Sequence, residues 1–230
     1  MTDTSIDNIT KNIPPEVYSK VTDTSLTTFS KLIRPITAAT DGFGKYIEQK
    51  FNNMVEVEKS LASYSIQVAL KKAEAKAQKK GIKLIPPIHP KSFIKSIEEV
   101  SKETNEILHE MWVNLITDQL INEDFHPYFI DILSGFSPSE AHILSTLLPR
   151  EKLNKNGGWI LGHYNEFKYW IKNSGDLELN KWDYSCVHLI QYGLAGVLSH
   201  GRDDMYKKED KVALLFKTTA GELFLSTVSE

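Results

Sequence analysis

WVNL at residues 112–115 and HPYFIDILSGFSPSEA at residues 126–141 contain the clearest helix signals of this chain. Ser137 suits a helix N-cap, because its hydroxyl can accept a hydrogen bond from a free backbone N–H group. Pro138 then falls at the first helical position, where its missing N–H costs nothing, and Glu140 completes a capping box. We therefore predict that a helix begins directly after Ser137.

Upstream of this helix start, apolar side chains recur at helical spacing. They predict one long amphipathic helix over residues 97–120 and a shorter one over residues 128–133. Trp112 and Phe129 lie on these two apolar stripes, and we expect both side chains to be buried anchors of the fold.

The N-terminal part of the chain is predicted to be helical after a polar start. Residues 1–24 are interpreted as a flexible arm, because they offer few apolar groups to bury. Residues 25–85 are interpreted as an N-terminal helical region. Apolar spacing predicts three helices in it, over residues 26–36, over residues 43–55 after a break at Gly42 and Gly44, and over residues 61–80.

The third of these helices is rich in alanine and lysine, which favour helix but leave little to bury. We expect its end to project from the body and Gly81 to stop it. The prolines at positions 86, 87 and 90 exclude a continuous helix and predict a domain boundary. Residues 86–135 are then a linker with amphipathic helices.

Residues 136–230 alternate helix signals with two strand signals. A helix is predicted from Asn180 to Tyr192, and two strands, residues 195–200 and 211–217, form a hairpin around a charged tip. A second capping box, Thr219 with Glu222, predicts a closing helix. The predicted fold class is mainly α, with a C-terminal winged helix-turn-helix whose wing is this β-hairpin.

The quoted stretches resemble the abortive infection alpha (Abi-alpha) family of prokaryotic proteins, which shares a tryptophan-centred helix, an HP-aromatic-F element and an SP-x-[DE]-A helix start. The resemblance covers residues 84–228, is strongest over residues 106–141, and leaves residues 151–178 as an apparent insertion. It implies an anti-phage setting and brings no catalytic residue set. The residues that match the motif are Trp112, Asn114, Leu115, His126, Pro127, Phe129, Leu133, Ser137 and Pro138.

Length and composition are those of an ordinary globular protein, with 230 residues and 41% hydrophobic residues. The longest apolar runs are far shorter than the roughly 18 to 20 residues of a membrane span. We expect a cytoplasmic protein without a membrane partner. The single cysteine, Cys186, is expected to be a small buried group on a helix rather than a nucleophile.

Charge is distributed unevenly along the chain. Residues 61–95 contain eight lysines and one acid, whereas residues 96–150 contain two cations and ten acids, so we expect the two blocks to face each other. The basic block is interpreted either as a solvated helix face, partly neutralised by the acidic segment, or as a contact strip for nucleic acid or an anionic membrane. Its lysines are Lys71, Lys72, Lys76, Lys79, Lys80 and Lys83.

The predicted reading helix of the winged helix has few groups that bind DNA. Lys181 is its only cation, beside outward positions at Asp183, Tyr184, Ser185, His188 and Gln191. In the wing, four acids balance Arg202, Lys207, Lys208 and Lys211. A specific DNA reader usually shows a net basic face, so only weak nucleic-acid binding is expected.

The patterns of common enzymes and metal proteins do not occur in the sequence. It contains no glycine-rich phosphate loop, no serine nucleophile elbow and no cysteine–histidine dyad. His109, followed by Glu110, has no second histidine at the spacing of a zinc-protease helix. The other histidines considered have no cysteine or carboxylate at ligand spacing; they are His126, His142, His163, His188 and His200. We expect no cofactor and no metal, and aromatic residues between Trp159 and Trp170 that form either core or a stacking surface.

We therefore interpret the chain as a non-enzymatic anti-phage defence protein that acts as a sensor, adaptor or regulator through protein contacts. Its protein partner and phage trigger are not identified, and self-association is left open. Two alternatives remain: a nucleic-acid-binding winged-helix regulator, and a membrane-perturbing effector that uses the helices between Leu26 and Val55.

Overall fold

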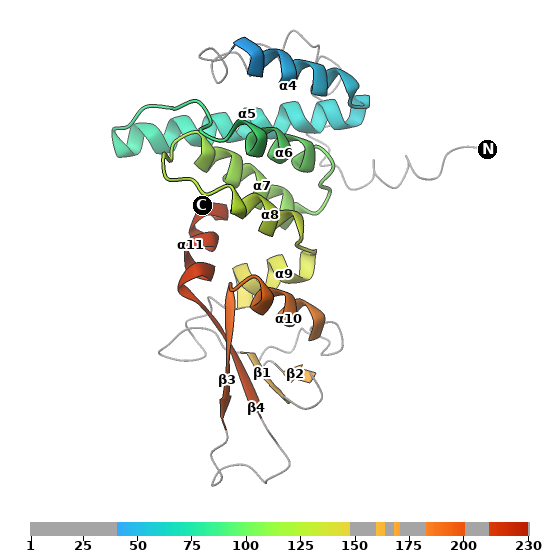
Figure 1. Ribbon diagram of the computed structural model, residues 1–230, viewed down its shortest axis with the longest axis vertical. Helices are drawn as coiled ribbons and strands as arrows, with labels where there is room; N and C mark the ends of the chain where they lie inside the picture. Colours follow the sequence, from blue (N-terminus) through green and yellow to red (C-terminus); the bar gives the residue numbers. More distant parts are fainter. Residues whose placement is uncertain (1–40, 148–159, 164–167, 171–182, 201–211, 230) are drawn as a thin grey trace, which may run out of the picture. The chain divides into compact units, whose positions relative to one another are not determined.

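The computed structural model describes residues 41–147, 160–163, 168–170, 183–200 and 212–229, and the described chain is mainly helical (Figure 1). It forms two compact units, one that ends at Ser134 and one that spans Gly135–Ser229. The predicted arm over residues 1–24 and the predicted helix over residues 26–36 lie outside the described residues.

The first unit is a set of packed helices. Its helices are α4 (Asp41–Asn53), α5 (Glu56–Lys80), α6 (Pro90–Val100), α7 (Glu106–Gln119) and α8 (Tyr128–Ser134). Helix α5 packs against α6 and α7, and α6 also contacts α7 and α8. Since α5 precedes the proline-rich segment and α6 and α7 follow it, the prolines do not separate two compact units.

The alanine-rich end of α5 is better packed than its composition suggests. Ala69, Ala73 and Ala77 are buried, and the Thr117 hydroxyl of α7 donates a hydrogen bond of 3.2 Å to the Ala69 carbonyl oxygen. Small side chains allow the two backbones to approach closely, and tight packing then replaces large apolar groups. The expectation that this end projects is therefore wrong for the alanine face, and only residues 78–80 are exposed on every side.

The expected single helix over residues 97–120 is two helices. Helix α6 ends at Val100, and α7 begins after Asn105, whose side-chain oxygen accepts the N–H groups of Ile107 (3.1 Å) and Leu108 (3.2 Å). Both helices bury apolar residues in one core, so the apolar spacing continued across the break. The N-cap signal of Asn105 was present in the sequence and outweighs that spacing.

Two glycine predictions have opposite outcomes. Helix α4 begins at Asp41 and runs through Gly42 and Gly44, so these glycines do not break it. Gly81 does end α5, with a φ of 68°, in the left-handed region that favours glycine. Its N–H group and that of Ile82 bond back to the carbonyl oxygens of Gln78 and Ala77.

The second unit combines short helices with a four-stranded antiparallel sheet. Its elements are α9 (Pro138–His142), a π-helical turn (Ile143–Leu147), β1 (Ile160–His163), β2 (Lys168–Trp170), α10 (Asp183–Gln191), β3 (Ala195–His200), β4 (Val212–Lys217) and α11 (Thr219–Val228). The strand order is β2-β1-β4-β3. The expected β3–β4 hairpin is confirmed, with Ala195 opposite Lys217, whereas β1 and β2 were not expected.

Of the two helix caps that the sequence predicts in this unit, the structure confirms the cap of α9 but not that of α11. The capping box at Ser137 is confirmed, since the Glu140 carboxylate accepts the Ser137 N–H at 2.9 Å. The N-cap of α11 is Thr218 and not Thr219, because the Thr218 hydroxyl accepts the Gly221 N–H at 3.0 Å. The capping box predicted for Thr219 and Glu222 is therefore wrong by one residue.

Candidate functional site on helix α5 and the motif residues

The apolar motif residues belong to the core of the first unit. Trp112 is only 2% exposed, and Leu115 of α7 and Leu133 of α8 are also buried. Phe129 is only half-buried. The expected burial is therefore confirmed for Trp112, whereas the side chain of Phe129 stays partly exposed. Phe129 is the second residue of α8, and its ring contacts that of Phe125 edge-on and that of the exposed His126.

The polar motif residues hold the backbone and neighbouring side chains in place. Buried Asn114 accepts a hydrogen bond of 3.0 Å from the Lys72 ammonium group. His126 is exposed, and its Nδ1 accepts the Tyr128 N–H at 3.2 Å, which agrees with the expected loop role before Pro127. Ser137 caps α9, with Pro138 at its first position.

The basic and acidic blocks meet along α5 and α7, as expected. Lys72 lies 3.2 Å from Glu110. Burial raises the pKa of Asp118, and the hydrogen bond from Asn122 and the charges of Lys76 and Lys80 oppose this rise. These lysines therefore serve partly as counter-charges for α7, and they are less available for an external ligand.

The other lysines of the strip lie on α5 or directly after it, and Lys80 is exposed with them although its charge also acts on Asp118. Lys71, Lys79, Lys80 and Lys83 are exposed. The other candidate contact residues, Lys181, Arg202, Lys207 and Lys208, lie outside the described residues. Within the described part, the candidate contact surface is thus reduced to the solvent side of α5.

A part-buried histidine cluster between α5 and α7 was missed by sequence reasoning. The Nε2 atom of His109 lies 2.8 Å from the Ser65 hydroxyl, and its ring stacks on Tyr64 at a centroid distance of 6.2 Å. Burial lowers the pKa of His109, and the charge of Glu110 opposes this only in part. No local signal joins residues 44 positions apart, so only the helix packing shows this cluster.

A second polar cluster joins α9 to α10. Glu140 is buried and lies 3.3 Å from Nδ1 of His188, a pairing across 48 positions that the spacing in the sequence did not indicate. Burial tends to raise the pKa of Glu140, but hydrogen bonds from the Ser137 hydroxyl, from the backbone and from Ser185 outweigh it and lower the pKa. Ser185 is therefore buried beside Glu140 and does not face outward as predicted.

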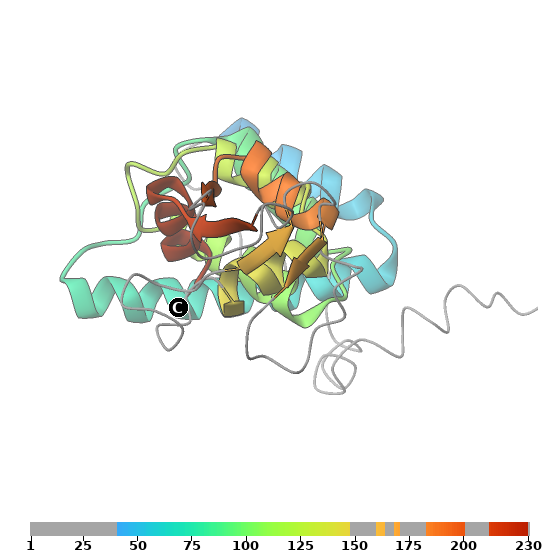
Figure 2. The ribbon, with the colours of Figure 1, turned by 90° about the horizontal axis from the view of Figure 1, so that it is seen from below.

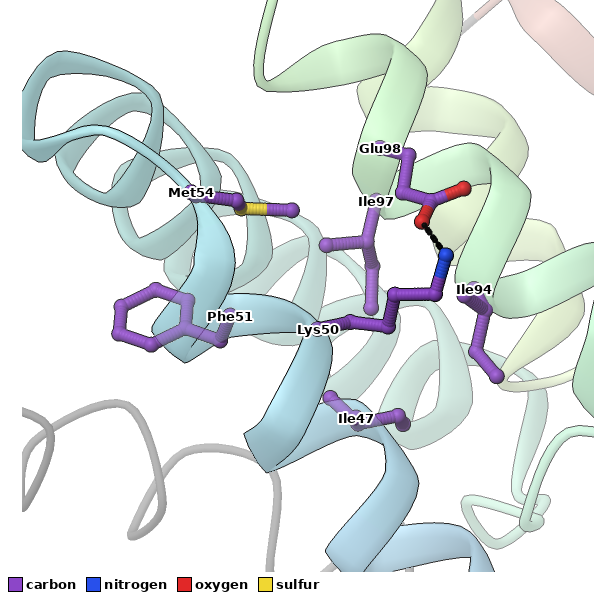
Figure 3. A pocket seen from close by; sticks show the side chains of 7 residues that line it. All are labelled: Ile47, Lys50, Phe51, Met54, Ile94, Ile97 and Glu98. Carbon is purple, nitrogen blue, oxygen red and sulfur yellow. Dashed lines mark ion pairs between the residues drawn. The ribbon is translucent and has the colours of Figure 1, made fainter.

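A small pocket lies between α4 and α6 (Figure 3). Figure 3 shows apolar side chains of both helices around it and the Lys50–Glu98 ion pair at its side, with a distance of 2.8 Å. Its volume open to a water-sized molecule is about 10 Å³, far below the roughly 300 to 1,000 Å³ of small-molecule sites. The apolar residues that line it are Ile47, Phe51, Met54, Ile94 and Ile97.

Among the described residues, no helix is long and apolar enough to cross a membrane. No group of three or more histidine, cysteine, aspartate or glutamate side chains among them is arranged to hold a metal ion. Cys186 on α10 is a buried cysteine, as the sequence predicts.

The two titrating clusters predict acid sensitivity in separate pH ranges. The pKa of His109 is lowered from 6.5 in the folded chain, so the unfolded chain takes up this proton first and stability falls as the pH drops below 6.5. His109→Gln should remove this part of the slope in urea unfolding. Glu140→Gln should flatten the curve only below pH 4.5, the ordinary value of that carboxyl group. Equal slopes above that value in wild type and His109→Gln would contradict the assignment.

The comparisons with known proteins give one result. The family model described as abortive infection alpha matches residues 65–220, from the middle of α5 into α11. Searches of curated proteins and of solved structures find no significant match. The matched region is more than half of the chain and includes the Trp112 helix and the Ser137 capping box. The chain belongs to the abortive infection alpha family.

Proposed function

We propose that this chain is a non-enzymatic protein of anti-phage defence that acts as a sensor, adaptor or regulator through protein contacts. Family membership carries the defence setting. The non-enzymatic reading is supported by the polar motif residues, because Asn114, His126 and Ser137 each hold another residue or the backbone in place. A catalytic group would need its polar atoms directed at a substrate.

The surface of the second unit supports protein contact as the mode of action. Tyr184 is 77% exposed on α10, and Leu223 is 59% exposed on α11. The rings of Tyr184, His188 and Tyr192 follow one another along α10, with centroid distances of 5.8 and 4.6 Å. Tyrosine is enriched where proteins bind each other, because it covers a large area at low entropic cost.

A plaque assay tests this proposal. Expression of the chain, with its native neighbouring genes if present, should reduce phage plaques, and the purified chain should show no nuclease, protease or nucleotidase turnover. Tyr184→Ala should weaken protection at least tenfold without changing the melting temperature, about 1.4 kcal/mol of lost contact energy. The matched control is Tyr46→Ala, which removes an exposed tyrosine of the first unit. A purified metal-dependent hydrolytic activity that is lost on changing His126 or His163 would overturn the proposal.

One observation favours the nucleic-acid alternative. The order α10, β3, β4, with β1 pairing beside β4, is the order expected for the reading helix and wing of a winged helix. Because the predicted reading helix has Lys181 as its only cation and the charges of the wing balance, any DNA retention should be weak, nonspecific and strongly reduced by salt. Mobility shifts at two salt concentrations test this. Sequence-selective binding at physiological salt that depends on Lys181 would favour the regulator over the adaptor.

The membrane-perturbing alternative depends on residues 26–55. The first predicted helix lies outside the described residues, and α4 turns Ile47 and Phe51 into the core of the first unit. The described part of this region therefore uses its apolar face for packing.

A further inference from the structure

Three aliphatic side chains are exposed directly after α5. Ile82, Leu84 and Ile88 are 42%, 39% and 49% exposed. We name residues 78–91 the α5 tip. In both ribbon views, the end of α5 and the segment that follows it lie at the edge of the first unit (Figures 1 and 2). Large aliphatic groups gathered on an edge usually mark a contact surface.

The α5 tip is held by the body of the unit, so these side chains are presented from an anchored backbone. The Ile82 N–H donates to the Ala77 carbonyl oxygen at 3.0 Å, and the Ile85 N–H donates to that of Leu120 at 2.9 Å. Pro87 is buried, whereas its neighbours Pro86 and Ile88 are exposed. Residues 81–84 are all exposed, so Ile82 and Leu84 reach solvent beside Lys83 in a segment that is neither helix nor strand.

The charge around these groups is entirely positive along the chain. Residues 75–97 contain six lysines and no acid. Asp118 lies near Lys76 and Lys80, and Lys95 pairs with Asp131 at 2.8 Å. Among the described residues, the three others make no ion pair. They are the exposed Lys79, Lys83 and Lys91.

We propose that the α5 tip docks on an anionic lipid surface. Ile82, Leu84 and Ile88 enter the boundary between headgroups and acyl chains, and the uncompensated lysines face the lipid phosphates. An apolar group combined with basic side chains is the composition of peripheral membrane contacts. The contact is peripheral and needs no membrane-spanning helix.

The composition of the α5 tip favours a lipid surface over single-stranded nucleic acid or a protein partner. Surfaces that bind single-stranded nucleic acid use aromatic rings and arginine for stacking. The tip contains no phenylalanine, tyrosine, tryptophan or arginine, and its one ring, that of His89, is only partly exposed. Protein interfaces are enriched in tyrosine, tryptophan, arginine and methionine and are depleted in lysine. Residues 78–91 contain lysine and aliphatic groups but none of those four residue types.

Flotation of the full chain with vesicles tests the proposal. The chain should float with vesicles of phosphatidylcholine mixed with phosphatidylglycerol and remain unbound with phosphatidylcholine alone. Lys79→Glu/Lys83→Glu should reduce partitioning by about thirtyfold or more, since each lysine near an anionic leaflet contributes about fivefold. Lys45→Glu/Lys102→Glu is the matched control, because it changes the net charge equally at two exposed lysines outside the tip.

A second pair of variants tests the apolar contribution. Ile82→Ser/Leu84→Ser should also lower partitioning at least tenfold, since each buried methylene contributes about 0.8 kcal/mol. Val55→Ser/Leu223→Ser is its control, because both side chains are exposed elsewhere. Melting curves of all four variants check that each is folded.

Three outcomes would overturn the proposal. One is equal binding to both vesicle types, and another is a loss of binding in the control variants as large as in the tip variants. The third is retention on duplex DNA or on a poly-glutamate peptide that needs Lys79 and Lys83 while vesicles are not bound. The proposal does not depend on the defence role, because flotation is measured without phage.

Discussion

Trp112→Ala should lower the free energy of unfolding by about 3 to 5 kcal/mol, which is the usual cost of truncating a large aromatic residue in a core. The indole of Trp112 is 2% exposed in the middle of α7, the helix that packs on both α5 and α6. Its removal leaves a cavity that these helices cannot close without losing their own contacts. Urea unfolding followed by circular dichroism measures the change.

Phe129→Ala is the control for this prediction. Phe129 also matches the family motif but is only half-buried, so its truncation should cost clearly less than that of Trp112. A Trp112→Ala variant with the melting temperature of wild type would show that the indole does not anchor the core. Equal losses for both variants would show that the difference in burial does not matter.

Gly221→Ala should destabilise the second unit by about 3 kcal/mol, at the upper end of the cost of overpacking. Gly221 lies in the first turn of α11, where an added Cβ would meet the Leu194 carbonyl oxygen far inside contact distance and would lie 3.0 Å from its carbon. That carbonyl oxygen already accepts the Thr218 N–H at 3.0 Å, so moving it would also disturb the cap of α11. Thermal unfolding measures the loss.

Gly42→Ala provides the matched comparison. Gly42 also lies in the first turn of a helix, and nothing within 4 Å would meet an added Cβ. Alanine favours helix over glycine by roughly 0.5 to 1 kcal/mol, so this variant should be neutral or slightly more stable. Stabilisation by Gly221→Ala would show that the Leu194 backbone moves easily and would contradict the prediction.

Local chemistry made several elements predictable. The capping box at Ser137, the stop at Gly81 and the β3–β4 hairpin are each encoded within a few residues. A cap or a tight turn depends on hydrogen bonds and backbone angles between near neighbours, so adjacent residues are sufficient to specify it. The prediction of one long helix over residues 97–120 was wrong because the apolar spacing continued across the helix break. The break itself follows from local chemistry, since Asn105 caps α7.

Contacts between distant segments were not predictable in the same way. The His109–Ser65 and Glu140–His188 contacts join residues 44 and 48 positions apart. The strands β1 and β2 are four and three residues long, and they are defined by their pairing with one another and with β4. The candidate site reflects this difference. The sequence identified the lysine strip on α5 but not which of its lysines α7 neutralises.

The sequence by itself determined the family, the mainly helical class, the helix start at Ser137 and the basic character of α5. Tertiary structure alone decided which of these features are available to a partner. Packing of α5 on α7 buried the alanine face and placed Asn114, Glu110 and Asp118 against its lysines. Burial and charge pairing depend on what lies across the interface, and helical periodicity does not specify the facing helix. The exposed lysines and aliphatic groups of the α5 tip therefore became a candidate site only in the folded chain.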